Sequence, residues 1–241
     1  MPSLLSRLVE TAEDHSAAFA VIRRHQSNQL DVLTGTIVDV ETLADIPLGK
    51  GRNAQDVLAL VPFRQVRERG FTATDDGFPL RCLLVSEREK TSLSDALAIL
   101  PASTVPVESL GFDVSDEDYA RTVRDIVSEE IGRGEGSNFV ISRSFLGRTA
   151  ASPATAVLNW LRTLLMAEQG AHWTFAVHTP GHSLVGASPE CHVSVRDGVV
   201  TMNPIAGTLR HAADGPTRAD VLGFDPTSRR ARSSSWSLMK R

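Results

Sequence analysis

The stretch from residue 184 to residue 208, LVGASPECHVSVRDGVVTMNPIAGT, predicts two strands joined by a tight turn. Val193, Val195 and Val199 alternate with polar neighbours on the two sides of Arg196-Asp197-Gly198. An Asp-Gly pair between alternating apolar residues is a strong signal for a β-hairpin, because glycine tolerates the positive φ that such turns need. This part of the chain therefore favours antiparallel β-structure.

The two ends of this hairpin carry groups that could contact a ligand. Glu190 follows Ser188-Pro189 at the start, and the small-residue bend Pro204–Thr208 (PIAGT) lies at the far end. A turn between them would bring the ends together and place an acid beside a loop with free backbone N–H groups, which suits an anionic ligand. On the residues alone, a solvated strand start remains the alternative for Glu190.

Composition limits the class of protein. A chain of 241 residues with 41% hydrophobic residues is long enough for one substantial core or two small domains. The net charge of −4 gives no reason to expect nucleic acid or an anionic membrane as a partner. Cys82 and Cys191 have no CxxC spacing, and no apolar run reaches the roughly 20 residues of a membrane span. We therefore expect a soluble protein of the reducing cytoplasm, without a signal peptide.

The first hundred residues predict antiparallel strands with a few helices. Helical spacing of leucines indicates a helix from Ser3 to Glu13, and another is expected from Leu93 to Leu100, before Pro101. Apolar runs predict strands at residues 19–24, 30–40, 57–62 and 80–85. The three arginines of Phe63–Gly70 could form an anion site, although a solvated face is the favoured interpretation.

The second half continues this mixture after a connecting segment at residues 101–115. Ser115 is placed to cap a helix that ends near Gly132, because three acids follow it in the first turn. Further elements are a strand that begins at Phe139, a helix at residues 154–168 and strands at 172–179 and 182–185. The Ser- and Arg-rich stretch at 225–241 has no periodicity and is expected to be disordered.

Four motifs in this order resemble the chorismate-utilising enzymes, the family of anthranilate synthase component I, aminodeoxychorismate synthase, isochorismate synthase and salicylate synthase. The motifs are LALVPFRQVRERGF, EEIGRGEGSNFVISRSF, HWTFAVHTPGHSLVGASPE and HVSVRDGVVTMNPIAGT. The resemblance runs from about residue 55 to Phe224 and is closest to the phenazine-pathway branch, the 2-amino-2-deoxyisochorismate synthases.

The resemblance implies an α+β fold, with two packed antiparallel β-sheets, outer helices and an active site between the sheets. It implies that residues 1–112 form the N-terminal part of the synthase fold and that 113–224 begin the chorismate-binding catalytic region. Residues 225–241 would be an unrelated tail, so the fold is expected to be incomplete at the C-terminus.

The chemistry implied by the resemblance is addition of ammonia at C2 of chorismate, with Mg²⁺ and with loss of the C4 hydroxyl. A glutamine amidotransferase domain or subunit would supply the ammonia, and the phenazine-type relatives are expected to form homodimers. Glu190 would be the general acid, because hydroxide is a poor leaving group. Asn138 occupies the place of a lysine in water-using members and so favours ammonia. Ala206, Gly207 and Thr208 would bind a substrate carboxylate.

The magnesium ligands of the family are expected downstream of Phe224, where this chain has DPTSRRARSSSWSLMKR, a stretch without glutamate. We therefore expect a truncated form that lacks the metal ligands. The alternatives are an inactive fragment, a non-catalytic protein that binds chorismate or a partner, or an anthranilate synthase that also eliminates pyruvate.

Two unrelated enzyme classes fit the sequence less well. A zinc hydrolase would need histidines and cysteines at metal-binding spacing, and none of the known patterns is present. The residues concerned are His172, His178, His182, Cys191 and His192. A serine hydrolase is weaker still, because GASPE lacks the second glycine of the GxSxG motif.

Overall fold

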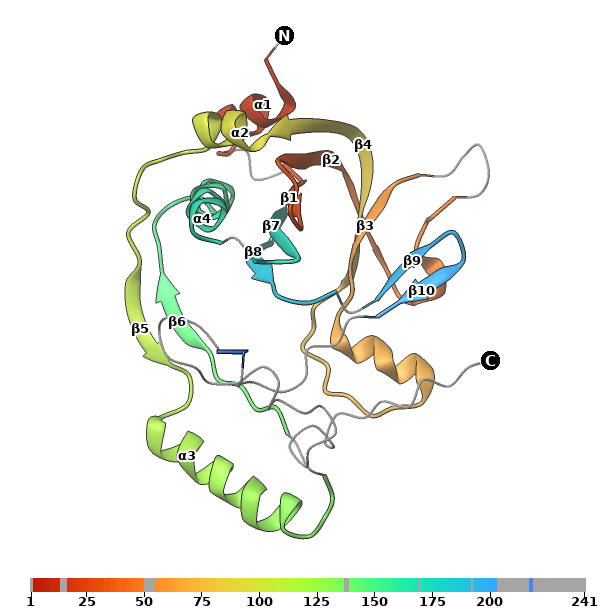
Figure 1. Cartoon of the computed structure of the whole chain (residues 1–241), viewed down its shortest axis with the longest axis vertical. Helices are drawn as coiled ribbons and strands as arrows, with labels where there is room; N and C mark the ends of the chain where they lie inside the picture. Colours follow the sequence, from red (N-terminus) through yellow and green to blue (C-terminus); the bar gives the residue numbers. More distant parts are fainter. Residues whose placement is uncertain are drawn as a thin grey trace. The chain divides into compact units, whose positions relative to one another are not determined.

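The computed structural model describes residues 2–13, 17–49, 55–136, 139–168, 170–191, 193–202 and 217–218 (Figure 1). The chain divides into two compact units. Unit 1 consists of Met1–Pro106 with Ala150–Cys191, and unit 2 consists of Val107–Thr149 with His192–Arg241. The functional boundaries expected at residues 112 and 224 stay predictions.

Unit 1 contains a six-stranded sheet in the order β3-β4-β2-β1-β7-β8, with every neighbouring pair antiparallel. Its strands are β1 (Phe19–Arg24), β2 (Gln29–Val40), β3 (Val57–Leu60), β4 (Leu80–Ser92), β7 (Trp173–Thr179) and β8 (His182–Ser188). Together with the helices, this sheet confirms the α+β class and the antiparallel strands expected from the sequence.

Serine residues set the start of each α-helix in unit 1. These helices are α1 (Leu4–Glu10), α2 (Leu93–Ile99) and α4 (Pro153–Ala167); the unit also contains the short helices η1 (Leu43–Asp45) and η3 (Phe63–Arg69). The hydroxyls of Ser3, Ser92 and Ser152 accept hydrogen bonds from N–H groups of the first turns of α1, α2 and α4. These caps satisfy backbone donors that a helix leaves open at its start. Helix α1 is shorter than predicted and ends at Glu10.

The alternation of side chains along β1 divides the core into two clusters. Phe19 and Val21 face α1, α2 and α4, which cover one side of the sheet (Figure 1). Ala20 and Ile22 point to the other side and pack with Val177. Because both sets are almost fully buried, the larger side chains, Phe19, Val21, Ile22 and Val177, each contribute roughly 1.5–3 kcal/mol by leaving water. Strand β1 is therefore the centre of the unit.

Strand β4 extends seven residues further than the predicted strand, through the polar sequence SEREKTS. Its backbone pairs there with the first half of β2, so that Lys90 lies opposite Asp31 and Glu89 lies opposite Val32. The prediction was too short because it followed apolar residues, whereas the strand is held by its backbone pairing and by charged contacts with the adjoining strand.

Asp31 is the centre of those charged contacts. It is nearly buried and accepts hydrogen bonds from Arg24 at 3.2 Å and from Arg88 at 2.8 Å, and Arg88 also contacts Asp56. A buried carboxylate needs such partners because desolvation disfavours its charge. The network therefore joins β1, β2 and β4 at one end of the sheet.

The described residues of unit 2 form two short strand pairs and one long helix. Strand β5 (Glu108–Phe112) pairs with β6 (Phe145–Arg148), and β9 (Ser194–Arg196) pairs with β10 (Val199–Thr201). Helix α3 (Asp116–Asp125) continues as the π-helical turn η4 (Ile126–Ile131). The predicted hairpin is confirmed, and Asp197 and Gly198 at its turn both have positive φ, at 51° and 77°.

Two predictions for unit 2 were wrong. The connecting segment at 101–115 contains strand β5, and the strand predicted from Phe139 begins only at Phe145. The hydroxyl of Tyr119 donates to the carbonyl of Ile141, and Arg143 is held by Asp116. Side chains of α3 thus hold the segment before β6, which has no strand partner there.

We expect Asp31→Asn to lower the free energy of unfolding by about 2 kcal/mol at neutral pH, because the buried partner of two arginines loses its charge. Burial raises the pKa of Asp31, but hydrogen bonds from Arg88 and Arg24 outweigh it and hold the pKa below 3.8. A carboxyl whose pKa is lower in the folded state than in the unfolded state stabilises the fold. The stabilisation is fully present above the unfolded-state pKa and is lost as the pH falls through the folded-state pKa. Urea unfolding should therefore show wild-type stability falling below about pH 4, and less so in the variant.

The matched control is Asp56→Asn, which removes an exposed partner of the same Arg88. Its effect should stay within about 0.5 kcal/mol, because exposed ion pairs are weak. Equal effects of the two variants would contradict the central role of Asp31.

We also expect Gly35→Ala to destabilise the chain by about 3 kcal/mol. A Cβ at Gly35, in the β-bulge between β2 and β4, would lie 1.8 Å from the carbonyl oxygen of Leu84. Backbone atoms of a central strand cannot move aside as a side chain can. Gly170→Ala is the control, because its Cβ would meet only Glu168 at 3.7 Å. Thermal unfolding measures both, and an unchanged midpoint for Gly35→Ala would refute the close contact.

Candidate functional site

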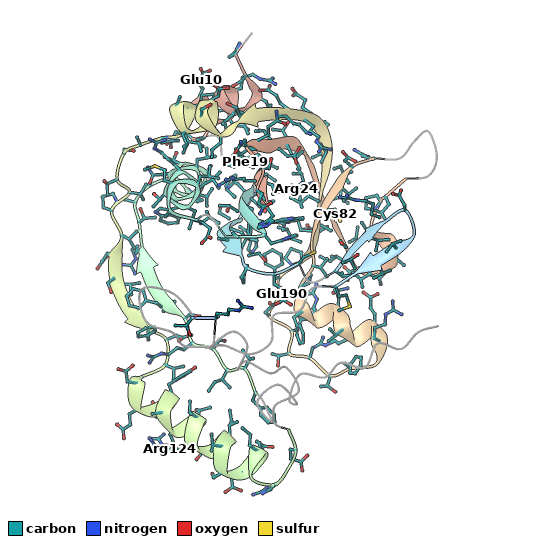
Figure 2. The ribbon with its side chains drawn as sticks, viewed as in Figure 1. Glu10, Phe19, Arg24, Cys82, Arg124 and Glu190 are labelled. Carbon is teal, nitrogen blue, oxygen red and sulfur yellow. The ribbon has the colours of Figure 1, made fainter. Side chains whose placement is uncertain are left out.

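Glu190 lies two residues past the end of β8 and is half-buried (Figure 2). Its backbone is fixed by Ser188, whose hydroxyl donates to the Glu190 carbonyl oxygen at 3.0 Å. The Ser188 carbonyl in turn accepts from the backbone N–H of His172 at 2.7 Å. Pro189 adds a fixed φ between them. These contacts hold the backbone that carries the Glu190 side chain at the end of β8.

Antiparallel pairing brings further polar and aromatic side chains to the same end of the sheet. Ser188 lies opposite Trp173 on β7, and Trp173 lies opposite Arg24 on β1. The Arg24 guanidinium lies 5.5 Å from the centre of the Trp173 ring, and the rings of His172 and His25 stack at 6.2 Å. This sheet end offers aromatic and imidazole faces, while Asp31 balances the charge of Arg24.

Sequence reasoning missed this group, although a signal for it existed. The strands FAVIRR and HWTFAVHT were both predicted, but their pairing was not. Pairing them antiparallel, with Phe19 opposite His178, places Arg24 beside Trp173. The identity of the neighbouring strand was the missing information.

The other predicted site residues lie outside the described part of the chain. These are Asn138, Ala206, Gly207 and Thr208. Their roles, and the role of Glu190, stay predictions.

The histidines proposed for a zinc site have different surroundings. His178 is buried, packs against Phe19 and lies with Nδ1 2.7 Å from the hydroxyl of Ser183. His182 lies with Nδ1 3.3 Å from an N–H group of Arg81, and His192 is outside the described residues. Across the ranges that the structure describes, no group of three or more His, Cys, Asp or Glu side chains could hold a metal ion.

The arginine-rich segment at η3 is engaged in local contacts. Arg64 donates to Asp75 at 2.8 Å, and Arg67 donates to the carbonyl of Ala73. The hydrogen bond from Arg64 lowers the pKa of Asp75. These groups line a depression of about 440 Å³ that also holds Glu41 and Glu68. The acids balance the arginines, so the depression does not present an uncompensated positive charge to an anion.

Helices long and apolar enough to cross a membrane are not found among the described residues.

A family model described as chorismate binding enzyme matches residues 67–220. The chain belongs to this family. The match includes β4, α4, β7, β8 and the Glu190 turn, so the resemblance seen in the motifs is confirmed.

Curated relatives place the chain more closely within this family. Two proteins named "Anthranilate synthase, phenazine specific", from Pseudomonas chlororaphis and Pseudomonas fluorescens, are 41% and 40% identical over 227 residues. These alignments cover 92% of this chain and 35% of each relative. A "2-amino-4-deoxychorismate synthase" from Streptomyces globisporus is 33% identical over 127 residues, which is 52% of the chain and 24% of that relative. The chain thus spans about a third of the length of the Pseudomonas relatives.

We expect Ser188→Ala to increase the mobility of Glu190 while leaving the core intact. The variant loses one hydrogen bond, so the unfolding free energy should change by only about 1 kcal/mol. NMR order parameters at Glu190 and Cys191 should fall, whereas those of β7 should not. Ser86→Ala is a matched control, because Ser86 also donates to a backbone carbonyl of the sheet, that of Thr34. Unchanged order at Glu190 would show that Ser188 does not hold it.

Proposed function

We propose that this chain provides part of a chorismate-converting synthase that adds ammonia at C2 and releases the C4 hydroxyl, giving 2-amino-2-deoxyisochorismate. The observation that carries the proposal is 41% identity to a phenazine-specific anthranilate synthase across 92% of the chain. Family membership from residue 67 to residue 220 supports chorismate as the substrate class.

The names of the relatives bear on the product. "2-amino-4-deoxychorismate" describes a chorismate skeleton that has gained an amino group at C2 and lost its C4 hydroxyl. That is the change made in the proposed reaction. The name of the Pseudomonas relatives refers to anthranilate, which would require a further elimination of pyruvate. The word "phenazine" in that name leads us to propose that the reaction stops at the aminated intermediate.

In the proposed reaction, Glu190 acts as the general acid. The nitrogen lone pair of ammonia forms the bond to C2, the ring double bonds shift, and the C4–O bond breaks. The carboxyl of Glu190 gives a proton to the departing hydroxyl, which leaves as water, and the new ammonium group loses a proton to solvent. The half-buried location of Glu190 at a strand end, with its backbone held by Ser188, supports this proposed role.

The other predicted residues have complementary proposed roles. Asn138 carries a neutral amide, which cannot remove a proton from water and so favours ammonia as the nucleophile. Backbone N–H groups of Ala206 and Gly207, with the hydroxyl of Thr208, would bind a substrate carboxylate.

Mg²⁺, ammonia supply and a homodimer belong to the proposal on family grounds. Mg²⁺ prefers carboxylate oxygens, and the described residues do not fit such a site because they offer no acidic cluster. No step above is therefore assigned to the metal. A glutamine amidotransferase domain or subunit would supply ammonia. Cys82 and Cys191 are free thiols, which fits a cytoplasmic location.

The deciding experiment is turnover of chorismate with Mg²⁺ and ammonium, measured by loss of chorismate absorbance and by identification of the product. The chain should be assayed alone and together with the remaining part of the P. chlororaphis relative, since it spans only about a third of that protein. Glu190→Gln should lower kcat by about 10²–10⁴-fold, because the amide cannot donate the proton.

Glu10→Gln is the control, since Glu10 lies on α1 and outside the proposed site. It should keep the wild-type rate. Absence of turnover, both by the chain alone and by the chain together with the remaining part of the relative, would refute the proposed function. A fully active Glu190→Gln variant would refute only the role of Glu190.

A further inference from the structure

Unit 2 has no fully buried side chain among its described residues, 107–136, 139–149 and 193–202. Large apolar side chains are nevertheless present on both of its main elements. On the helix, Val123 and Val127 are 39% and 56% exposed, and on the β5–β6 pair Phe112 and Phe145 are 49% and 60% exposed. Unit 1 differs in having two buried apolar clusters, although Phe63 and Phe71 are 76% and 67% exposed there.

Such elements are not stable by themselves. A two-stranded ribbon is marginal in water, and a helix of this length gains most of its stability from packing of its apolar face. The stripe of Tyr119, Val123, Ile126 and Val127 has the helical spacing of a face that packs against another element. The exposed apolar side chains of unit 2 therefore need an apolar surface to pack against.

We call the exposed side chains of Val123, Val127, Phe112 and Phe145 the unit 2 apolar face. The rings of Phe112 and Phe145 meet edge to face at 5.0 Å. The guanidinium of Arg143 lies 3.8 Å from the centre of the Phe112 ring and 4.9 Å from that of Tyr119. Arg143 therefore joins the ribbon to the start of the helix, where Tyr119 lies.

The relatives show where a cover could come from. Their similarity to this chain extends over 92% of its length, so unit 2 belongs to the shared part. They also contain about twice as much additional polypeptide, since the shared part is only 35% of their length. The apolar face lies in the region shared with the relatives, and the relatives contain much additional polypeptide. We therefore take that additional polypeptide as the partner that packs on the face.

We propose that the unit 2 apolar face is the docking surface for the polypeptide that corresponds to the remaining two thirds of the Pseudomonas relatives, and that this polypeptide packs apolar side chains on Val123, Val127, Phe112 and Phe145. The inference is independent of the proposed reaction. It concerns binding and can be tested without turnover.

The test uses the full 241-residue chain and, as a separate polypeptide, the part of the P. chlororaphis relative outside the region aligned to this chain. The two are co-expressed, purified through a tag on the second polypeptide, and their affinity is measured by titration of the separated components. Carbene labelling of each sample then reports which side chains are covered. Val127 and Phe145 should be labelled in the free chain and protected at least fivefold in the complex.

Val127→Arg should weaken binding by at least tenfold, because a charge would enter an apolar contact. Ser128→Arg is the matched control, since it adds the same side chain at the next position, on the polar side of the helix, and it should change affinity less than twofold. Phe145→Ser, on β6, provides a second test that leaves the helix unaltered. Far-UV circular dichroism and thermal unfolding that match the unaltered chain should confirm that each variant is folded.

Three results would overturn the proposal. Protection of Val127 and Phe145 in the free monomer would mean that this chain covers the face itself. Protection that depends on protein concentration would identify a second copy as the occupant. No binding to a soluble, folded polypeptide, or equal binding by Val127→Arg and Ser128→Arg, would show that this face is not the docking surface.

Discussion

The antiparallel pairing of β2 with β4 is the constraint on which unit 1 depends. The paired residues extend along the whole of β2, from Gln29 opposite Ser92 to Val40 opposite Leu80. The single shift in register at Gly35 keeps both halves aligned, and Leu84 allows no side chain there. Every other strand of the sheet is attached to one of these two, either directly or through β1.

The ends of this pair hold the neighbouring elements in place by polar contacts. At one end, Asp31 gathers Arg24 and Arg88. At the other, Arg81 binds both carboxylate oxygens of Asp39 and donates to the carbonyl of Pro180 in the β7–β8 turn. The pKa of Asp39 is lowered by its hydrogen bonds to Arg81. The strand that leads to Glu190 is thus anchored where it begins.

Local patterns predicted the local features of the fold. The run FAVIRR gave β1 to the residue, and Asp197-Gly198 gave the turn between β9 and β10. The second half of β4 was missed because SEREKTS has no apolar signal and depends on its neighbour. The segment before β6 was predicted as a strand because alternation cannot show that Tyr119 binds its backbone.

The candidate site could be predicted only in part for the same reason. Glu190 was singled out from a motif, and the position of its backbone depends on Ser188 and on the backbone of His172. The group of Trp173 and Arg24 depends on a pairing between strands from opposite ends of the chain. Sequence patterns identify strands, but they contain little information about which strands become neighbours.

The position of β1 between β2 and β7 has a consequence for synthesis on the ribosome. Phe19 and its partners in β2 emerge early, whereas β7 begins only at Trp173. Until then, one edge of β1 has no partner, and the helix α4 that covers it has not been made. Such an edge is prone to pair with other chains. Nascent chains of this protein should therefore depend on chaperones for most of their elongation.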